Sequence, residues 1–107
     1  MVHFDNKQFD LGNVKYGETK TVTVNITNLS PFSITLQPAN ASCSCTTGSI
    51  DHSTLQPNSK AIFTIYFNST KAGIGANQVR SINLNYQLNG QSYQENFQLK
   101  SNVVQSV

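Results

Sequence analysis

The stretch "SINLNYQLNGQSYQENFQL", residues 81–99, decides the fold of this chain. Apolar and polar residues alternate on both sides of Asn89-Gly90. Such alternation is typical of a strand with one buried face, and Asn-Gly is the preferred two-residue type I′ turn of a β-hairpin. The turn fixes the register and predicts four facing pairs: Leu88 with Gln91, Tyr86 with Tyr93, Leu84 with Glu95, and Ile82 with Phe97. Apolar residues face each other in two of the four pairs, and Glu95 opposite Leu84 fits only if this face opens to solvent there.

The same alternation continues toward the N-terminus. Segments 21–28, 32–38 and 60–68 place apolar residues on one face, which are Val22, Val24 and Ile26, then Phe32, Ile34 and Leu36, then Ala61, Phe63, Ile65 and Phe67. We expect two further strands, at residues 2–11 and near residues 49–55. About seven short strands separated by turn signals predict an all-β, immunoglobulin-like antiparallel β-sandwich. A small closed barrel is the alternative. The 107 residues predict a single immunoglobulin-like domain over residues 1–107.

Uncharged polar residues dominate the composition. Asn, Gln, Ser and Thr make up 44 of the 107 residues, while charged residues make up 11% and the net charge is +2. The seven basic residues are never adjacent, and nucleic-acid binding requires a basic cluster. No apolar run is long enough to span a membrane, and the N-terminus lacks the pattern of a signal peptide. We therefore expect a chain with no nucleic-acid or membrane partner that stays in its compartment of synthesis.

Several landmarks occur in a specific order along the chain. Phe9-Asp10-Leu11-Gly12 opens it, Gly17 marks the following turn, Cys43-Ser44-Cys45-Thr46 follows, and Gln56-Pro57-Asn58 precedes the strand at 60–68. This order resembles a bacterial and phage immunoglobulin-like family without an assigned function, whose members carry a Phe-Asp-Phe-Gly-like opening and a Cys-x-Cys-Thr signature. It is also similar to Hydin-type and major-sperm-protein-type sandwiches. The resemblance covers roughly residues 9–104. It implies a protein–protein interaction module and supplies no catalytic residues.

Cys43 and Cys45 are the only cysteines and form the first candidate site. On an extended segment their side chains point to the same side, about 6.5–7 Å apart. Three states are open: thiolate ligands of a soft metal ion, a disulfide that closes a small ring, or two reduced, partly buried thiols that pack as small hydrophobes. With His3 and His52 the chain has four Cys and His residues, but their spacing matches no zinc template. The third state is favoured, so we expect no metal and no cofactor.

The other motifs give no catalytic site. Asp51, His52 and Ser53 are consecutive, and consecutive strand residues point to opposite faces, so they cannot form a relay. The Gly-x-Gly of residues 72–77 precedes a strand, whereas a phosphate-binding loop opens a helix. This segment is expected to be a flexible loop and, with Tyr16 and Tyr66, a candidate contact. We expect no enzyme and no small-molecule substrate.

The function is inferred by exclusion. We expect a structural or assembly module that binds a larger protein through sheet edges, loops and uncharged faces. A virion accessory protein is favoured, namely a capsid decoration or connector subunit made in the host cytoplasm, whose partner is a large homo-oligomeric assembly. Two alternatives stay open. One is a cellular or cell-envelope protein–protein interaction domain, and the other is a thiol- or metal-binding module that uses Cys43 and Cys45.

Overall fold

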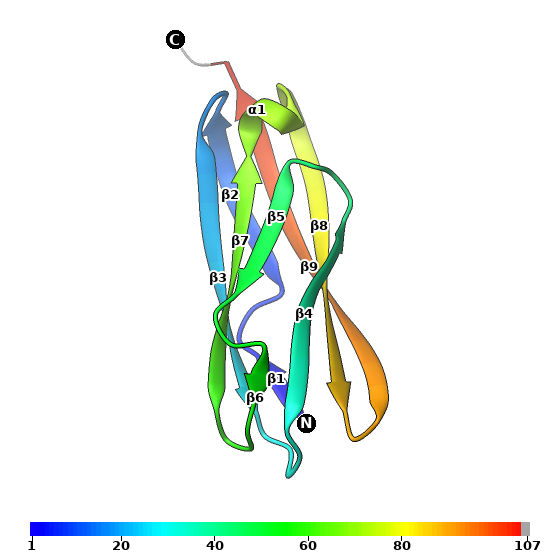
Figure 1. Ribbon diagram of the computed structural model, residues 1–107. Helices are drawn as coiled ribbons and strands as arrows, with labels where there is room; N and C mark the ends of the chain where they lie inside the picture. Colours follow the sequence, from blue (N-terminus) through cyan, green and yellow to red (C-terminus); the bar gives the residue numbers. More distant parts are fainter. Residues whose placement is uncertain (106–107) are drawn as a thin grey trace.

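The computed structural model describes residues 1–105, without the side chains of Ala39 and Asn40. Nine strands and one short helix follow one another (Figure 1): β1 (Val2–Phe4), β2 (Gln8–Lys15), β3 (Thr19–Asn28), β4 (Ile34–Ala41), β5 (Thr46–Ile50), β6 (Thr54–Leu55), β7 (Lys60–Asn68), α1 (Ser69–Ala72), β8 (Gly75–Leu88) and β9 (Gln91–Val104). The chain is all-β, as expected. The molecule is elongated, with extents of 51 × 19 × 18 Å.

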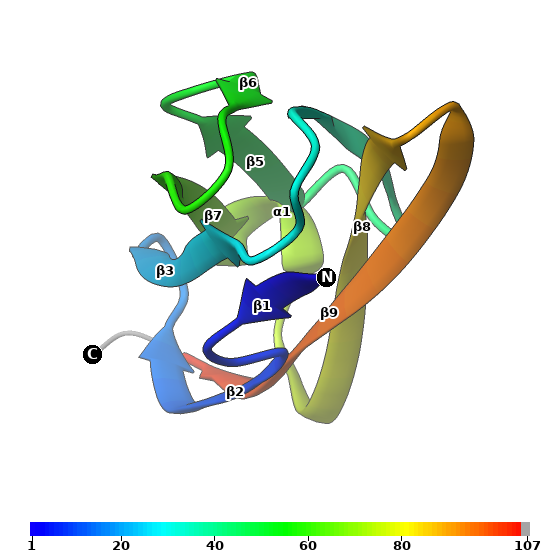
Figure 2. The ribbon, with the colours of Figure 1, turned by 90° about the horizontal axis from the view of Figure 1, so that it is seen from below.

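The strands form the two layers of a sandwich, which Figure 2 shows along the long axis. One sheet has the order β1-β3-β7-β5 and the other has the order β2-β9-β8-β4-β6. Every pairing is antiparallel except one, because β2 runs parallel to β9. The immunoglobulin-like sandwich predicted from the sequence is confirmed, although the parallel pair was not expected.

The count of nine strands rather than seven has a simple origin. The strand expected at residues 2–11 is divided into β1 and β2, which lie in different sheets. Asp5 marks the break, because its backbone N–H and its carboxylate are both hydrogen-bonded to Asn25. The strand expected near residues 49–55 is likewise divided into β5 and β6, again in different sheets. At both places the chain crosses from one sheet to the other, so one expected strand becomes two.

The β8–β9 hairpin has the predicted register. Tyr86 faces Tyr93 and Ile82 faces Phe97, as the Asn89-Gly90 turn requires. The rings of Tyr86 and Tyr93 stack with centroids 5.1 Å apart. Phe97 makes edge contacts with two rings of the opposite sheet, those of Phe4 at 5.6 Å and Phe63 at 5.4 Å. The aromatic core therefore joins the hairpin to β1 and β7.

The alternation predicted for the other strands holds with one exception. Val24, Ile26, Ala61, Phe63, Ile65 and Phe67 are all buried, and so are Ile34 and Leu36. Phe32 was expected to share the buried face with Ile34 and Leu36, and this prediction was wrong. Its side chain is 45% exposed because β4 begins only at Ile34. Ser30 and Asn28 hold residues 28–32 in a turn through side-chain hydrogen bonds, so alternation does not extend to Phe32.

The pairing of Leu84 with Glu95 also has an explanation. Leu84 is fully buried, whereas the side chain of Glu95 opposite it is one-quarter exposed. The strand β9 pairs with β2 only from Gln98 onward, so Glu95 lies beyond the edge of that pairing. Its carboxylate accepts a hydrogen bond from Lys7 Nζ at 3.0 Å. The carboxylate of Glu95 is therefore partly solvated and forms an ion pair with Lys7.

Candidate functional site

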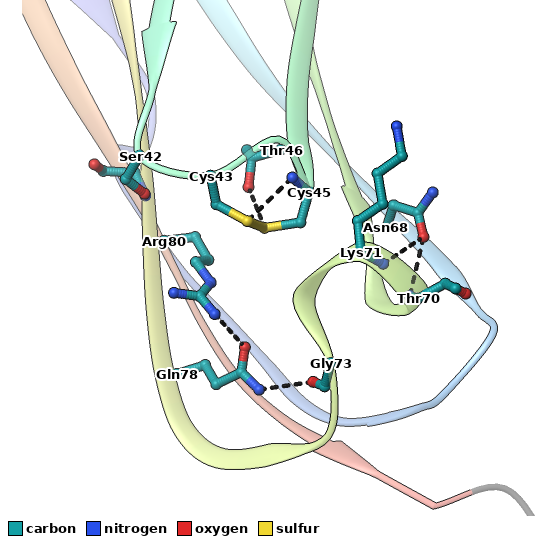
Figure 3. Close-up of a disulfide and its surroundings, with 11 residues drawn as sticks. Ser42, Cys43, Cys45, Thr46, Asn68, Thr70, Lys71, Gly73, Gln78 and Arg80 are labelled. Atoms are coloured by element: carbon teal, nitrogen blue, oxygen red, sulfur yellow. Dashed lines mark hydrogen bonds between the residues drawn. A yellow bond between two sulfur atoms is a disulfide. The ribbon is translucent and has the colours of Figure 1, made fainter.

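Cys43 and Cys45 form a disulfide in the connection between β4 and β5 (Figure 3). The favoured prediction of two reduced thiols was wrong. It assumed an extended segment, whereas the backbone turns here and the N–H of Thr46 donates to the carbonyl of Cys43 at 3.2 Å. The turn brings the two Cα atoms to 5.1 Å, which lies within the range that a disulfide spans.

The two sulfurs have different surroundings. Cys45 is 1% exposed, and its Sγ contacts Thr46 Oγ1 at 3.5 Å. Its carbonyl accepts a hydrogen bond from the N–H of Asn68 at the end of β7. Cys43 is only partly buried, and its Sγ accepts from the N–H of Cys45 at 3.1 Å. One sulfur is therefore enclosed and the other reaches the surface.

The remaining metal-ligand candidates are not brought to this position. His3 lies in β1 and faces Thr27, and His52 lies in the turn after β5. Among residues 1–105, no group of three or more His, Cys, Asp or Glu side chains could hold a metal ion.

Arg80 lies beside the disulfide, and sequence reasoning missed it. It shares its face of β8 with Ile82 and Leu84, which are core residues, so it belongs to the inner side of the sheet. Its terminal NH₂ donates to Gln78 Oε1 at 2.9 Å, and Gln78 Nε2 donates to the carbonyl of Gly73 at 2.9 Å (Figure 3). Arg80 Nε is buried and has no hydrogen-bond partner among the described residues. The sequence signal was the spacing of two residues between Arg80 and Ile82, which places both side chains on the same face of the strand.

Asp51, His52 and Ser53 form no catalytic relay. Asp51 Oδ1 accepts from the N–H of Ile62 at 2.8 Å and lies 3.2 Å from His52 Nδ1. The hydrogen bond from Ile62 and, to a lesser degree, the contact with His52 hold the pKa of Asp51 below its ordinary value. Ser53 contributes its carbonyl, which accepts from the N–H of Leu36. The carboxylate therefore stabilises the end of β5.

Residues 72–77, expected to be a flexible loop, contain the end of α1 and the beginning of β8. Asn68 Oδ1 caps α1 by accepting from Thr70 N at 3.0 Å and Lys71 N at 3.4 Å (Figure 3). Ser69 Oγ donates to the carbonyl of Glu18, so the helix is tied to the turn after β2. Ile74 is 59% exposed between the two elements.

The two candidate contact tyrosines lie apart from each other. Tyr16 is in the turn between β2 and β3, and its N–H donates to the carbonyl of Val104. Tyr66 is on the outer face of β7, between β3 and β5. Both are about two-fifths exposed, and the structure does not bring them into one site.

The outer edge of β5 is unpaired. Hydrogen bonds from Asp51 N to Ile62 and from Asn68 N to Cys45 fix which main-chain groups of β5 face β7. By alternation, the N–H and C=O groups of Gly48 and Ile50 face away from β7. No strand in the described part of the chain pairs with them. Five consecutive residues, Thr46–Ile50, therefore form an edge without a charged side chain or a proline.

The outer face of the second sheet carries amide side chains. Gln94 Nε2 donates to Asn85 Oδ1 at 3.0 Å, and Asn96 Nδ2 donates to Asn83 Oδ1 at 2.8 Å. An open concavity of about 560 Å³ lies over β4, β8 and β9, and its lining has no charged residue. The sequence predicted uncharged polar faces, but not that this one is hollowed.

No helix among the described residues has the length and apolar character that crossing a membrane requires.

Many solved structures resemble the fold, and three of them illustrate the likeness. The ASH / PapD-like domain of human CEP192 (PapD-like domain 7) has 14% identity and a TM-score of 0.77, covering 99% of this chain and 87% of that one. The Vibrio cholerae VesB protease has 13% identity and a TM-score of 0.72, covering 95% and 32%. The periplasmic chaperone SfaE has 12% identity and a TM-score of 0.68, covering 96% and 57%. At these identities the likeness concerns the fold alone.

Sequence similarity gives one further result. Residues 2–103 match a family described as "Protein of unknown function (DUF1573)". Among curated proteins, no sequence matches the chain.

Proposed function

The chain belongs to the DUF1573 family of proteins of unknown function, and we propose that it is a protein-binding module that pairs an extended segment of its partner with the outer edge of β5. The observation that carries this proposal is the unpaired, uncharged edge at Thr46–Ile50. An extended peptide can add a strand to such an edge, where main-chain hydrogen bonds supply affinity. The PapD-like fold of the neighbouring structures is consistent with this use of a sheet edge.

The edges formed by β1, β2, β4 and β6 carry protecting features. Natural sheets block unwanted pairing with short edge strands, charges, prolines and bulges. β1 has three residues and β6 has two. β2 has a bulge at Gly12, where φ is +65°, and carries Asp10 and Lys15. On β4, the N–H of Leu36 points away from β8 and donates to Ser53, so alternation places Pro38 with its nitrogen on that open side. The edge of β5 has none of these devices.

Side chains along β5 suit a partner strand without charge. Thr47 and Ser49 are exposed on the outer face, while Gly48 faces the core. Neither an ion pair nor a large apolar pocket is offered there, so specificity would come from hydroxyl contacts and strand length. This favours a polar, uncharged segment of a protein partner over a charged peptide.

That the chain is not an enzyme stays a prediction from the sequence.

The proposal also concerns the location of the partner, which is either a virion or the bacterial cell envelope. The low surface charge supports a repetitive assembly such as a capsid, to which many copies could bind without mutual repulsion. The disulfide supports a place outside a reducing cytoplasm, since disulfides persist at virion and cell surfaces and in the periplasm. A virion and the bacterial cell envelope both meet these conditions. Fractionation would distinguish them: co-purification with virus particles supports the virion, and presence in the envelope of uninfected cells supports the envelope.

Site-specific photo-crosslinking in the native cell tests the proposal. A crosslinker at Thr47 lies next to the proposed strand, whereas one at Thr23 lies on the same outer face in β3, which β7 separates from β5. We expect a protein adduct from Thr47, its loss when Ser49→Lys is added, and little adduct from Thr23. Equal adducts from both positions, or an adduct that survives Ser49→Lys, would rule out the β5 edge.

A further inference from the structure

Beyond protein binding, we propose that Cys43–Cys45 is a site of thiol–disulfide exchange with a dithiol, in which Cys43 is the sulfur that is attacked and Arg80 stabilises the thiolates that form. The proposal depends on the position of the disulfide, on the unequal burial of its sulfurs and on the charge around them. It does not depend on the use of the β5 edge.

The disulfide does little to join distant parts of the chain. Its cysteines are two residues apart in sequence, and the entropy that a cross-link removes from the unfolded chain grows with the length of the closed loop. The chain already crosses from β4 to β5 through these residues, so no pair of strands depends on the S–S bond to meet. Reduction of this disulfide is therefore expected to leave the strand pairings intact.

The two sulfurs differ in accessibility. Cys43 is partly exposed, whereas Cys45 is 1% exposed beneath the turn (Figure 3). An external thiolate can therefore reach Cys43 Sγ and leaves Cys45 Sγ as the departing sulfur. The hydroxyl of Thr46 lies 3.5 Å from Cys45 Sγ and can donate a hydrogen bond to it. Accessible attack and a stabilised leaving sulfur are two of the conditions that speed exchange.

Contacts that continue the pairing of β4 with β8 bring Arg80 close to Cys43. Ala41 faces Ile82, and Ser42 and Ser81 are joined by two hydrogen bonds, from Ser42 N to Ser81 O at 2.8 Å and from Ser81 N to Ser42 Oγ at 2.9 Å. Arg80 precedes Ser81 in β8 and Cys43 follows Ser42 just beyond the end of β4, and Figure 3 shows the guanidinium between the disulfide and Gln78. Arg80 Nε is a buried donor without a partner among the described residues.

The elements around the disulfide carry positive charge alone. Arg80 of β8 is the charged group beside it, Lys71 of α1 has its side chain directed away in Figure 3, and no Asp or Glu occurs in β4, β5, α1 or β8. A guanidinium without a carboxylate partner is available for a thiolate. Cations close to a cysteine favour its thiolate form, which is the reactive one.

The exchange balances in two steps. A thiolate of the dithiol attacks Cys43 Sγ and forms a mixed disulfide, while the Cys43–Cys45 bond breaks and its electron pair leaves on Cys45 Sγ. The second thiolate of the dithiol then attacks its own sulfur in the mixed disulfide and releases Cys43. The chain gains two electrons and two protons and becomes a dithiol, and the reagent becomes a disulfide. The reverse reaction restores the pair.

Exchange is tested on the purified, folded chain with dithiothreitol as the dithiol. Samples are alkylated, and the intact mass counts the thiols. We expect two alkylated cysteines without loss of the β-sheet circular dichroism signal. Reduction that occurs only once the protein has unfolded would overturn the proposal.

Two single variants test which sulfur is attacked. Cys45→Ser leaves Cys43 alone and should form a mixed disulfide with oxidised glutathione, and Cys43→Ser leaves the buried Cys45, which should react at least about tenfold more slowly. Equal rates, or faster reaction of Cys45, would contradict the assigned order.

The part played by Arg80 is measured in the Cys45→Ser background. Arg80→Gln should slow alkylation of Cys43 by iodoacetamide at neutral pH by about fivefold and lower the thiolate absorbance near 240 nm. Lys60→Gln removes one positive charge at the beginning of β7, far from Asn68 and Cys45, and should leave both readings unchanged. Unchanged readings in Arg80→Gln, or equal losses in both variants, would remove Arg80 from the site.

Discussion

The ring of Phe63 occupies the space in which a side chain at residue 48 would begin. A Cβ built on Gly48 would stand 2.6 Å from Phe63 Cε1 and 3.0 Å from Ile82 Cδ1 of the opposite sheet. These distances are shorter than van der Waals contact. The missing side chain of Gly48 therefore allows an edge strand to lie directly on the aromatic core.

Gly48→Ala should lower the free energy of unfolding by about 1–3 kcal/mol, because the core must move to admit a methyl group. Urea unfolding measures the change. Ser49→Ala, on the exposed face of the same strand, is the control and should change stability by less than about 0.5 kcal/mol. A stable Gly48→Ala variant would mean that β5 is able to lift away from Phe63.

Phe97→Ala should cost about 3–5 kcal/mol of stability, since it removes a fully buried ring that contacts both Phe4 and Phe63. Thermal or urea unfolding gives the value. Asn96→Ala, its exposed neighbour, loses only a surface hydrogen bond to Asn83 and should be close to neutral. Similar losses in the two variants would contradict the assigned faces of β9.

Replacing both cysteines by serine should cost only about 1.5 kcal/mol, as expected from the entropy of a closed loop of this size. The comparison is made by urea unfolding of the oxidised wild type and of Cys43→Ser/Cys45→Ser. A loss above about 4 kcal/mol would show that the disulfide is a main support of the fold, which would remove one argument for its exchange.

Acidification should weaken the fold partly through Asp5. Hydrogen bonds from the side chain and backbone of Asn25 lower the pKa of this carboxyl in the folded protein. Its contribution is therefore complete above the unfolded value, near 3.8, and is lost as the pH falls through the folded pKa. Because Asp5 is exposed, the effect should be small. Asp5→Asn should flatten the stability profile in this acid range. The prediction fails if the two profiles are parallel.

The hairpin register could be predicted because every determinant is local. Asn89-Gly90 supplies the turn, and the flanking alternation identifies the buried face, so the pairing of Ile82 with Phe97 follows from the sequence alone. Pairing between β2 and β9 could not be predicted, since residues 8–15 and 98–104 are far apart in sequence and no turn joins them. The division of residues 2–11 into β1 and β2 was likewise not predictable, because each strand pairs with a segment distant in sequence.

The candidate site was predictable only in part. Two cysteines one residue apart identified the position, but their state depended on a turn that has no Gly or Pro to indicate it. Arg80 was hidden because a single basic residue in a strand usually faces water. Its inward position follows from its spacing of two residues from the buried Ile82. Only the hydrogen bond between Ser81 and Ser42 shows that this position lies near the cysteines. That the Cys-x-Cys-Thr motif is a family signature stays a prediction.

The parallel pairing of β2 with β9 has a consequence for the order of events during synthesis. β2 is an edge strand and its one strand partner among the described residues is β9, which is the last of the nine strands in chain order. Residues 8–15 must therefore wait, unpaired, until the ribosome has delivered residues 98–104. The first sheet has all its strands well before then, by residue 68. The second sheet therefore closes after the first, and the nascent chain carries an open strand until β9 has been made.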